Sequence, residues 1–494
     1  MEKTMARWEC IVCGLIYDER KGWPEDSIAP GTKWEDVPDD WMCPDCGVGK
    51  DDFERVPGSE HDALPEASES DVTPPALADQ GTSATDSATL SATTDITPTN
   101  APSEQAQLPA NQHVIIIGSG LAGVGLVREI RRHSPTVAIT VVTADGGEIY
   151  SKPLLSTGYT KGLNYDKLAI QSAHAFAQQF NVSVRSRTRV TAIDSAAKML
   201  TLEQGDPLSF DSLVLATGAA VITPPLTGDG AGDVLSINDL DDYAHFQALV
   251  ETRQVKKVAI IGSGLIGCEF TNDLLNGGFV TESVDPMGWC LPTLLPEACG
   301  LAVQTALESA GATFHFGKLA TSVQRVGDAY RMNLNDGTAI DADIVLSAVG
   351  VRPNTALAER AGIDVNRGIK TDAFLRTSVE GIFALGDCAE VEGHVLVYVA
   401  PLSAAARALG ATLTGQTTAV HYPAMPVAIK TPACPVTVAP PPRDAQGAWH
   451  IEGESPNLKA SFKDPNGHLL GYALTGDAVK EKSALTKRLP PVLE

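Results

Sequence analysis

The sequence predicts a multidomain protein in which a small four-cysteine metal module is joined by a disordered linker to a large α/β unit. We expect that unit to hold two nucleotide-binding domains and a small α+β C-terminal domain. Three features of the 494-residue chain predict this organisation. Two C-x-x-C-G segments lie near the N-terminus, a stretch without aromatic or basic residues follows, and two G-x-G-x-x-G segments come later. The length alone allows about three domains.

The composition excludes several classes of function. There are 61 Asp and Glu residues against 37 Lys and Arg, and the net charge of −24 disfavours nucleic-acid binding. No stretch approaches the ~18 apolar residues of a membrane span, so direct membrane insertion is not expected. Nine cysteines are too few for a disulfide scaffold. The first residues lack the apolar region of a signal peptide, so we expect a cytoplasmic protein.

The stretch from residue 57 to residue 110 separates two parts of different character. It contains no aromatic residue, no Lys and no Arg, and it is rich in Ser, Thr, Ala, Pro and acidic residues. Such a segment cannot bury enough apolar surface to offset the entropy lost on ordering. We therefore expect a flexible linker at 57–110 between a module at 1–56 and the remainder of the chain.

The two N-terminal cysteine pairs indicate a metal site. Two cysteines three residues apart can wrap one metal ion, and the glycine after each pair permits the left-handed backbone of such a turn. Four thiolates suit either zinc or a single iron, and spacing alone slightly favours a structural zinc. The expected ligands are Cys10, Cys13, Cys43 and Cys46.

The residues between the cysteine pairs favour iron. The module carries six large aromatic residues, 29 residues separate the two cysteine pairs, and a Pro-Asp-Asp-Trp segment leads to the second pair. Over residues 6–55 the sequence closely resembles rubredoxin. The resemblance implies one iron held by four thiolates, which cycles between ferric and ferrous and performs one-electron transfer. It also implies that the acidic surface docks onto basic patches of partners.

Two glycine-rich turns indicate that the large unit binds two dinucleotides. Each follows an apolar run of four residues, at 114–117 and 258–261, and each precedes an amphipathic segment. This strand–turn–helix context places a pyrophosphate at a helix N-terminus. Two copies suggest a hydride donor and a flavin that receives the hydride. The glycines are Gly118, Gly120 and Gly123 in the first turn, and Gly262, Gly264 and Gly267 in the second.

Acidic residues distinguish the two nucleotides. Asp285 ends the strand after the second turn, 23 residues beyond Gly262, where a carboxylate takes the ribose hydroxyls of NAD. No Lys or Arg lies within 285–289, so NADH is favoured over NADPH. After the first turn the strand at 138–142 is followed by Asp145 instead of the expected Glu, so Asp145 is only a candidate partner for the adenosine ribose of FAD.

Three further segments resemble those of flavoproteins that bind two dinucleotides. They contain Thr217-Gly218 of an Ala-Thr-Gly turn, Gly350 of a similar turn, and Gly386-Asp387 at a strand end. The resemblance implies that these residues approach the FAD and that Asp387 holds its ribityl chain. It also implies tandem Rossmann-like domains, with an FAD-binding domain at 111–224 and 346–415 and an NAD-binding domain at 225–345.

The remaining cysteines indicate how electrons leave the flavin. They show no paired redox motif, so each is expected to pack in a core, and electrons are expected to leave the flavin directly. These cysteines are Cys268, Cys290, Cys299, Cys388 and Cys434.

The segment 148–156 resembles the Tyr-x-(Lys/Arg)-Pro-x-Leu-Ser segment of ferredoxin and rubredoxin reductases. The resemblance implies that Lys152 and Pro153 lie near the flavin, with Lys152 paired to Glu269. Together the pair would orient the nicotinamide and balance buried charge. The alternative is that both are ordinary surface residues.

The C-terminal part, 416–494, is predicted to be a small α+β interface domain. Its Lys430-Thr431-Pro432 segment resembles that of rubredoxin reductases. Lys430 is therefore either a cation that stabilises the reduced flavin or a surface residue. Strands are expected at 449–452 and 469–474.

The chain as a whole resembles a rubredoxin fused to its own NADH-dependent reductase, a member of the FAD-dependent pyridine nucleotide oxidoreductases. The implied path runs from NADH through FAD to the iron, after the rubredoxin docks on its own reductase. The segments at 22–24 and 28–34 resemble rubredoxins that serve alkane monooxygenases, and a di-iron reductase of oxygen, nitric oxide or peroxide is the second candidate acceptor. Two other classes stay open: an NADH oxidase with a zinc-bound interaction module, and a disulfide or peroxide reductase.

Overall fold

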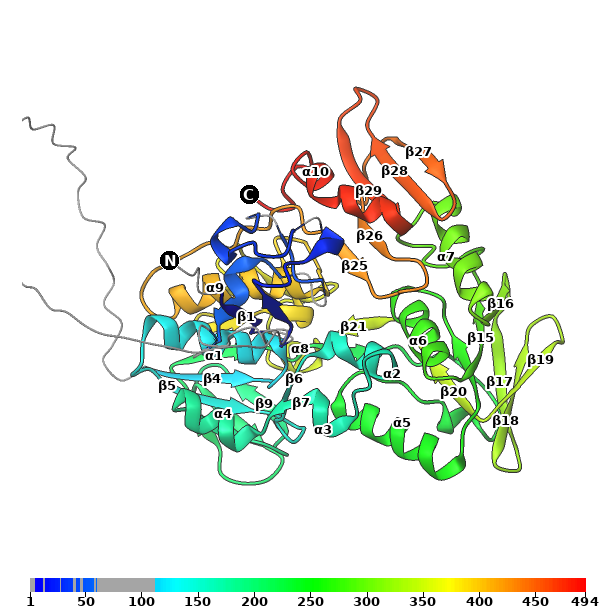
Figure 1. Ribbon diagram of the computed structural model, residues 1–494. Helices are drawn as coiled ribbons and strands as arrows, with labels where there is room; N and C mark the ends of the chain where they lie inside the picture. Colours follow the sequence, from blue (N-terminus) through cyan, green and yellow to red (C-terminus); the bar gives the residue numbers. More distant parts are fainter. Residues whose placement is uncertain are drawn as a thin grey trace, which may run out of the picture.

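The computed structural model describes residues 5–11, 14–26, 28–38, 41–44, 48–56, 59 and 112–494. Cys13, Cys46 and the predicted linker apart from Ser59 lie outside these residues. The described chain forms a small N-terminal module, two parallel sheets with their helices, and a C-terminal antiparallel sheet (Figure 1). Among the helices of the described ranges, none has both the length and the apolar character needed to cross a bilayer.

The N-terminal module is a three-stranded antiparallel sheet beside an aromatic core. Tyr17, Trp34, Trp41 and Phe53 are buried, with ring centroids 4.8 to 5.9 Å apart in their contacting pairs. A module this small has little apolar surface to bury, so these large rings supply much of its core. In sheet order the strands are β2 (Ile16–Asp18), β1 (Arg7–Cys10) and β3 (Phe53–Arg55), and the 3-10 helices are η1 (Pro24–Asp26), η2 (Trp34–Asp36) and η3 (Lys50–Asp52).

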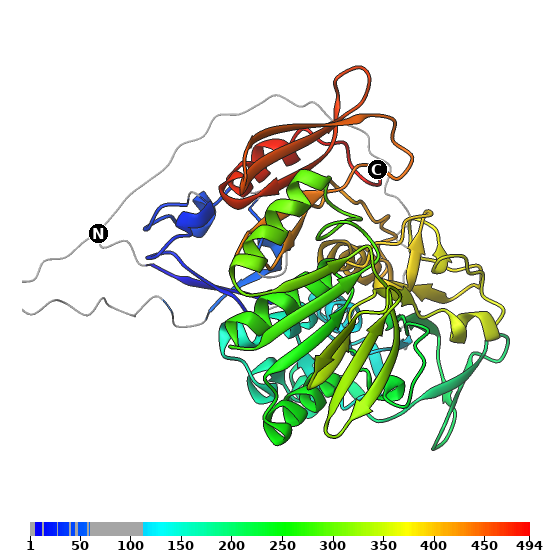
Figure 2. The ribbon, with the colours of Figure 1, turned by 90° about the vertical axis from the view of Figure 1, so that its right-hand side faces the viewer.

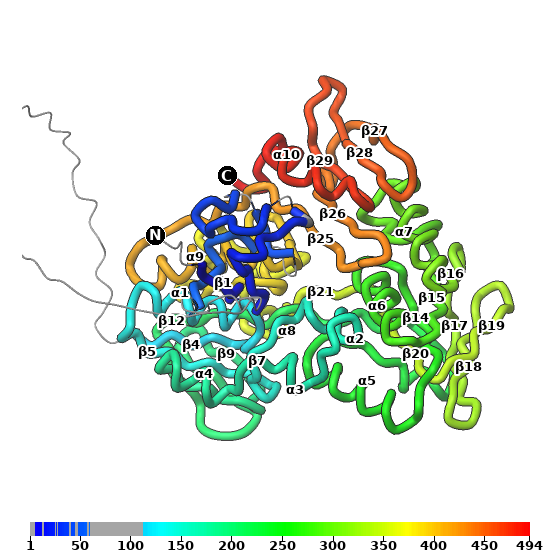
Figure 3. Tube along the Cα trace, in the orientation of Figure 1, coloured from blue at the N-terminus to red at the C-terminus, as the bar shows by residue number. Residues whose placement is uncertain are grey.

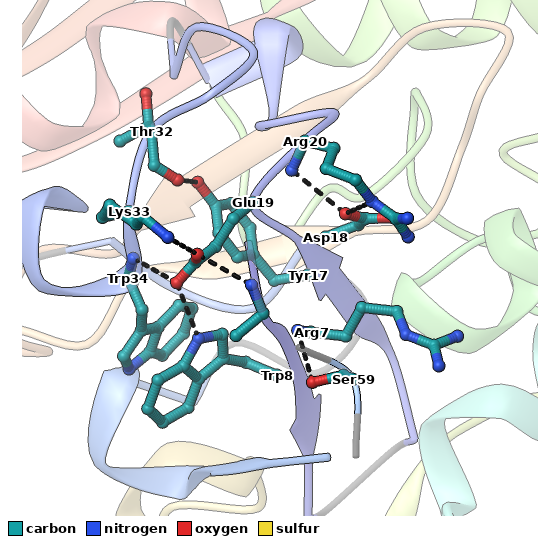
Figure 4. Close-up of polar contacts among 11 residues, drawn as sticks. Arg7, Trp8, Tyr17, Asp18, Glu19, Arg20, Thr32, Lys33, Trp34 and Ser59 are labelled. Atoms are coloured by element: carbon teal, nitrogen blue, oxygen red, sulfur yellow. Dashed lines mark hydrogen bonds and ion pairs between the residues drawn. The ribbon is translucent and has the colours of Figure 1, made fainter. Parts of the chain in front are cut away.

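A buried carboxylate, Glu19, ties the strands of this module to η2 (Figure 4). Its Oε2 accepts hydrogen bonds from the Ala6 backbone N–H and from Lys33 Nζ, both at 2.9 Å. Its Oε1 accepts from the Trp34 N–H at 3.0 Å and from Trp8 Nε1 at 3.1 Å. Burial opposes ionisation, but these donors outweigh it and hold the pKa of Glu19 below its ordinary value.

Acid stability of the module is expected to depend on Glu19. Because folding lowers its pKa, the stability that the carboxylate contributes is complete above its ordinary value of 4.5 and is lost as the pH falls below that value. We expect Glu19→Gln to lower the free energy of unfolding at neutral pH by about 2 kcal/mol and to weaken its acid dependence. Denaturant titrations followed by tryptophan fluorescence at several pH values measure both effects, and identical curves for the two proteins would contradict this role.

The first parallel sheet carries the first glycine turn. All five strands run parallel, and the residues 114–117 and 213–215 of its two central strands are apolar and buried. In sheet order the strands are β23 (Ile382–Ala384), β12 (Ser212–Leu215), β4 (His113–Ile117), β5 (Ala138–Val142) and β8 (Ser183–Arg185). The helices of this part of the chain are α1 (Leu121–His133), α3 (Tyr165–Leu168), α4 (Ala173–Phe180), α8 (Ala356–Arg360) and α9 (Val399–Thr412).

Smaller elements complete this part of the chain. Their order is β6 (Ile149–Tyr150), η5 (Lys152–Thr157), α2 (Gly158–Lys161), β7 (Ala169–Gln171), β9 (Val190–Asp194), β10 (Met199–Leu202), β11 (Leu208–Ser209), β22 (Ile369–Thr371), η7 (Gly386–Cys388) and β24 (Ala389–Val391). Among them, η5 and η7 carry the lysine and the aspartate that the sequence places at the flavin.

The second parallel sheet repeats this arrangement around the second glycine turn. In sheet order its strands are β16 (Thr313–Phe316), β15 (Val280–Asp285), β14 (Lys257–Ile261) and β20 (Ile344–Ser347). Its helices are α5 (Leu240–Arg253), α6 (Leu265–Asn276) and α7 (Glu297–Ser309). An antiparallel sheet of β17 (Ala320–Val326), β18 (Ala329–Leu334) and β19 (Ala339–Ala342) lies beside it.

The chain passes from the first parallel sheet to the second and back through one strand pair. The outgoing strand β13 (Ala219–Val221) pairs antiparallel with the returning strand β21 (Val351–Pro353). Hydrogen bonds of Asn354 reinforce the crossing: its N–H donates to the Gly218 carbonyl at 3.0 Å, and its Nδ2 donates to the Thr217 carbonyl at 2.7 Å.

The C-terminal domain is a five-stranded sheet packed against α7. It shares a core with the second parallel unit, in which Cys299 and Val303 of α7 cluster with Val436, Val438 and Ala460. In sheet order the strands are β25 (Val427–Ile429), β26 (Val436–Ala439), β29 (Leu469–Thr475), β28 (Asn457–Lys463) and β27 (Ala448–Glu454), followed by η8 (Gly476–Glu481) and α10 (Lys482–Thr486). Figure 2 shows this sheet standing above the parallel units.

Candidate functional site

A cavity of about 1720 Å³ lies between the two parallel units and the C-terminal domain. Both glycine turns line it, together with η5, η7 and the β13–β21 crossing. Figure 3 shows the chain segments that meet here, β21 and β25 among them. Typical small-molecule pockets measure roughly 300 to 1,000 Å³, so this cavity has room for more than one nucleotide.

The first glycine turn has the geometry of a pyrophosphate cradle. Gly118 has a φ of +117°, and a Cβ there would overlap the Ala216 carbonyl oxygen. A Cβ on Gly123 would overlap the Gly118 carbonyl oxygen, so α1 packs closely on its strand. At Gly120 a Cβ would meet no atom within 4 Å, which leaves space at the N-terminus of α1. These residues fit an FAD pyrophosphate, as the sequence predicts.

The second turn has the same construction. Gly262 has a φ of +103°, a Cβ on Gly267 would overlap the Gly262 carbonyl oxygen, and Gly264 is open. Asp285 is buried at the end of β15 and braces the turn. Its Oδ2 accepts from the Ser263 N–H at 2.7 Å, and its Oδ1 accepts from the Met287 N–H at 2.8 Å. The residues fit a second dinucleotide, with Asp285 holding the turn that would receive it.

Asp145 also lines the cavity and braces its own turn. Its Oδ1 accepts hydrogen bonds from Thr143 Oγ1 at 2.6 Å, from the Gly147 N–H at 2.9 Å and from Ser119 Oγ at 3.0 Å. The structure thus brings Asp145 to the first glycine turn, as the sequence predicts. Its binding to the adenosine ribose remains a prediction.

Lys152 of η5 and Asp387 of η7 both line the cavity. Burial lowers the pKa of Lys152, although the nearby Asp387 and Asp239 oppose this shift. Burial raises the pKa of Asp387, and the charge of Lys152 opposes it. Lys152 Nζ donates to Asn238 Oδ1 at 2.8 Å, and Asn238 Nδ2 donates to the Ala219 carbonyl at 3.0 Å. Lys152 is therefore not a solvated surface lysine.

The expected pairing of Lys152 with Glu269 is wrong. Glu269 is buried in α6, and its Oε1 accepts from Lys430 Nζ at 2.8 Å and from the Lys430 N–H at 2.9 Å. Its Oε2 accepts from Ser156 Oγ at 2.5 Å. A buried carboxylate requires a close cation and several donors, and Lys430 supplies both from the segment after β25. Lys152 instead bonds to Asn238.

This pairing settles where Lys430 lies and shows what the sequence interpretation missed. Lys430, Glu269 and Ser156 all line the cavity, so Lys430 is not a surface residue. Ser156 and Asn238 were missed as polar partners. The reductase-like segment contains Ser156, but neither residue carries a local signal of its contact, because their partners lie 113 and 86 residues away.

Gly386, which the sequence also predicts at the FAD, does not line the cavity; it has a φ of +79°, and a Cβ there would lie 2.7 Å from Ala122 Cβ. Four further predicted cofactor residues do line the cavity. They are Pro153, Thr217, Gly218 and Gly350. Gly218 and Gly350 have φ values of +64° and +104°, which glycine adopts without strain. Both flank the β13–β21 crossing, so the crossing brings these turns to the cavity.

Two of the four predicted metal ligands lie within the described residues. Cys10 and Cys43 are each 1% exposed and border the aromatic core. The Cys10 N–H donates to the Leu15 carbonyl at 2.8 Å, and the following Gly14 has a φ of +76°. These buried thiols and this tight turn fit a four-thiolate iron, as the rubredoxin resemblance implies.

The five other cysteines are all buried. Contact with Cys268 and burial together raise the pKa of Cys290, and burial raises the pKa of Cys299 to about 12. Protonated thiols inside a core behave as small apolar groups. Their positions agree with the packing role expected from the sequence.

Comparison with protein families divides the chain at the same places. Residues 7–53 match the rubredoxin family, residues 112–408 match the pyridine nucleotide-disulphide oxidoreductases, and residues 419–489 match the rubredoxin-binding C-terminal domain. Among solved structures, a ferredoxin reductase from Rhodopseudomonas palustris is 26% identical, with a TM-score of 0.69 over 77% of this chain and 96% of its own.

Two curated relatives are informative. A rubredoxin-NAD(+) reductase of Alcanivorax borkumensis is 52% identical over 77% of this chain and 99% of its own length. A nitric oxide reductase FlRd-NAD(+) reductase of Aliivibrio fischeri is 36% identical over 76% of this chain and 98% of its own length. The chain therefore belongs to the rubredoxin-NAD(+) reductase family of flavin-dependent pyridine nucleotide oxidoreductases, and it carries a rubredoxin domain in addition to the reductase.

Proposed function

We propose that this chain passes electrons from NADH through FAD to the iron of its own rubredoxin module, and from there to a terminal acceptor. The observation that carries the proposal is that two open glycine turns face a single cavity, and that the cysteine-bearing module belongs to the same chain. A flavin between them supplies the necessary chemistry, because it accepts a hydride as an electron pair and releases electrons singly.

The chain's own residues hold and orient the two nucleotides. We assign the FAD pyrophosphate to the N-terminus of α1 and its ribityl chain to Asp387. Thr217, Gly218 and Gly350, which line the cavity, are among the residues that would hold the FAD. Lys152 supplies a positive charge near Asp387. Holding donor and acceptor in one cavity contributes proximity, which is the main requirement of hydride transfer.

The Glu269–Lys430 pair places a second charged group in this cavity. Glu269 follows the second glycine turn on α6 and lines the cavity, so we assign it to the part of the wall that would receive the NADH. Because Ser156 and Lys430 fix the carboxylate, we assign it a role in orienting the nicotinamide, without a proton transfer. The Lys430 ammonium group balances the charge of the Glu269 carboxylate, so the pair adds no net charge to the cavity wall.

Replacing Asp285 is expected to weaken NADH binding. Asp285→Ala removes the acceptor of the Ser263 and Met287 N–H groups. The second turn therefore loses these two hydrogen bonds, and the proposed contact with the NADH ribose is lost as well. We expect the KM for NADH to rise about tenfold or more, with a smaller change in kcat, because the loss of one charged hydrogen-bond acceptor costs roughly 1.5 to 3 kcal/mol. Steady-state kinetics with an artificial acceptor measure this effect, and unchanged kinetics would remove the assignment of the second turn to NADH.

Anaerobic visible spectroscopy of the purified chain tests the proposed path. A ferric tetrathiolate centre gives bands beyond those of the flavin, and NADH should bleach both. Metal analysis should find one iron per chain. Flavin bands alone, together with bound zinc, would favour the alternative of an NADH oxidase with a zinc-bound interaction module.

We propose an alkane monooxygenase as the terminal acceptor. The module's resemblance to rubredoxins that serve such enzymes supports it. The 36% identical nitric oxide reductase FlRd-NAD(+) reductase supports a nitric-oxide-reducing di-iron protein as the second candidate. NADH-dependent turnover of each reconstituted acceptor distinguishes the two candidates.

A further inference from the structure

We propose that the rubredoxin module docks on the reductase of its own chain through a basic face of α1, α9 and α10, and that the iron is reduced from this docked position. The inference rests on the proposed electron path and adds the docking site to it. In Figures 1 and 2 the module lies beside the first parallel unit and beneath the C-terminal sheet.

The docking face carries the complementary charges that an acidic module requires. Three ion pairs and one further hydrogen bond join a cation of the reductase to an oxygen of the module. They are Arg407 with Asp52 at 3.0 Å, Arg132 with Glu54 at 3.1 Å, Lys482 with Asp26 at 2.9 Å, and Arg128 with the Ile11 carbonyl oxygen. Such pairs fix orientation and register more than they add affinity.

The Lys482–Asp26 pair and the carboxylate of Asp52 are sheltered from solvent, whereas Arg407 is 37% exposed. The side chain of Asp52 is 5% exposed, and those of Asp26 and Lys482 are 14% and 16% exposed. The core of the module also joins Leu154 and Leu155 of η5 in one hydrophobic cluster. An interface that buries both charge pairs and apolar side chains is a fitted one, unlike a loose encounter between acidic and basic surfaces.

The docked module is separated from the flavin cavity by a thin wall. A void of about 30 Å³ lies under Ile11, the residue that follows the ligand Cys10, and the void is lined on the reductase side by Leu121 and Leu402. Both leucines also line the large cavity. Side chains from α1 and α9 therefore stand between Ile11 and the cavity that we assign to the flavin.

Docking must alternate with electron delivery. One NADH supplies two electrons, and each ferric iron accepts one as it becomes ferrous, so the acceptor must oxidise the module between two transfers. In the docked position Asp26, Asp52 and Glu54 are bound to the reductase. They are free for an external acceptor only after the module leaves.

Zero-length carbodiimide coupling of the full chain tests whether the module docks on the reductase of the same chain. The reagent joins a lysine amine to a nearby carboxylate, so it should link Lys482 to Asp26. An equal mixture of isotopically heavy and light chains then shows whether the link forms within one chain. We expect linked peptides of uniform label, and their yield should fall at high salt. The pair Lys257–Glu282 at 2.5 Å, within the second parallel unit, is the internal reference.

A charge reversal on the docking face supplies the matched comparison. We expect Arg407→Glu to reduce the yield of the Lys482–Asp26 link several-fold and to slow reduction of the iron at least ~10-fold at low salt, relative to reduction of the flavin. Arg331→Glu reverses an exposed arginine that pairs with Asp341 far from the module, and it should change neither measurement.

Each outcome decides the proposal. Links of mixed label would show docking between two chains and would overturn it. Absence of the link while Lys257 and Glu282 are joined would also overturn it. Iron reduction that is insensitive to Arg407→Glu would show that electrons pass from another position. A chain without iron would defeat the proposed electron path, yet the coupling result would still report docking, so the two failures are distinguishable.

Discussion

Cys43→Ser is expected to abolish electron delivery to the terminal acceptor while NADH still reduces the flavin. Cys43 is 1% exposed within the aromatic core, and its thiolate is one of the four proposed iron ligands. Substitution of a residue that only contacts the ligands typically lowers metal affinity or activity about 10- to 100-fold. Loss of a ligand itself should therefore lower iron affinity by more than ~100-fold. Metal analysis, the visible spectrum and acceptor turnover measure the loss, and stopped-flow absorbance follows the flavin.

The matched control is Cys299→Ser, the same exchange at a buried cysteine of α7 outside the module. It should leave iron content and iron reduction unchanged. If Cys43→Ser eliminated flavin reduction as well as delivery to the acceptor, the module and the reductase would not function as separate units, and the proposed path would need revision.

Gly120→Val is expected to yield a folded chain without flavin. The backbone of Gly120 is extended, with φ −68° and ψ −179°, so a valine can adopt it. Its Cβ would meet no protein atom within 4 Å, so the added methyl groups can extend into the space left for the pyrophosphate. We expect FAD affinity to fall at least ~100-fold, equivalent to about 2.7 kcal/mol. Flavin content and FAD titration measure this loss.

The control for Gly120→Val is Gly232→Val in the 3-10 helix Ala231–Asp233. Gly232 is also open, and it lies outside the cavity lining. That variant should retain its flavin. Circular dichroism of both variants separates loss of flavin from loss of fold, and a fully loaded Gly120→Val protein would remove the first turn as the FAD site.

The parts of the site that the sequence predicts are those with local causes. Gly123 and Gly267 are required because a Cβ would overlap the carbonyl oxygen of the glycine five residues earlier. At the first glycine of each turn a Cβ would overlap a carbonyl oxygen just beyond the neighbouring strand. The strand before each turn and the helix after it follow from continuous apolar runs and amphipathic spacing. Asp285 follows from its place at the end of a strand, where the edge of a parallel sheet meets a nucleotide.

The parts that the sequence interpretation missed depend on contacts between distant segments. Glu269 and Lys430 are 161 residues apart, and neither residue shows in its neighbourhood which charge it meets. Resemblance placed Lys152 near the flavin, but the bond to Asn238 depends on how α5 and the β13–β21 crossing pack. The docking face is likewise invisible in sequence, because its cations come from three separate helices.

The three bonds of Glu269 have a mechanical consequence. The carboxylate belongs to the second parallel unit, Ser156 to the first, and Lys430 to the C-terminal domain, so one side chain fastens all three. Any hinge opening between them would leave the Glu269 carboxylate without its hydrogen-bond donors in a poorly solvated place, which is energetically unfavourable. We therefore expect the three parts of the reductase to keep fixed relative positions during turnover. Nucleotides would then enter and leave without domain opening, and the large movement would be that of the N-terminal module.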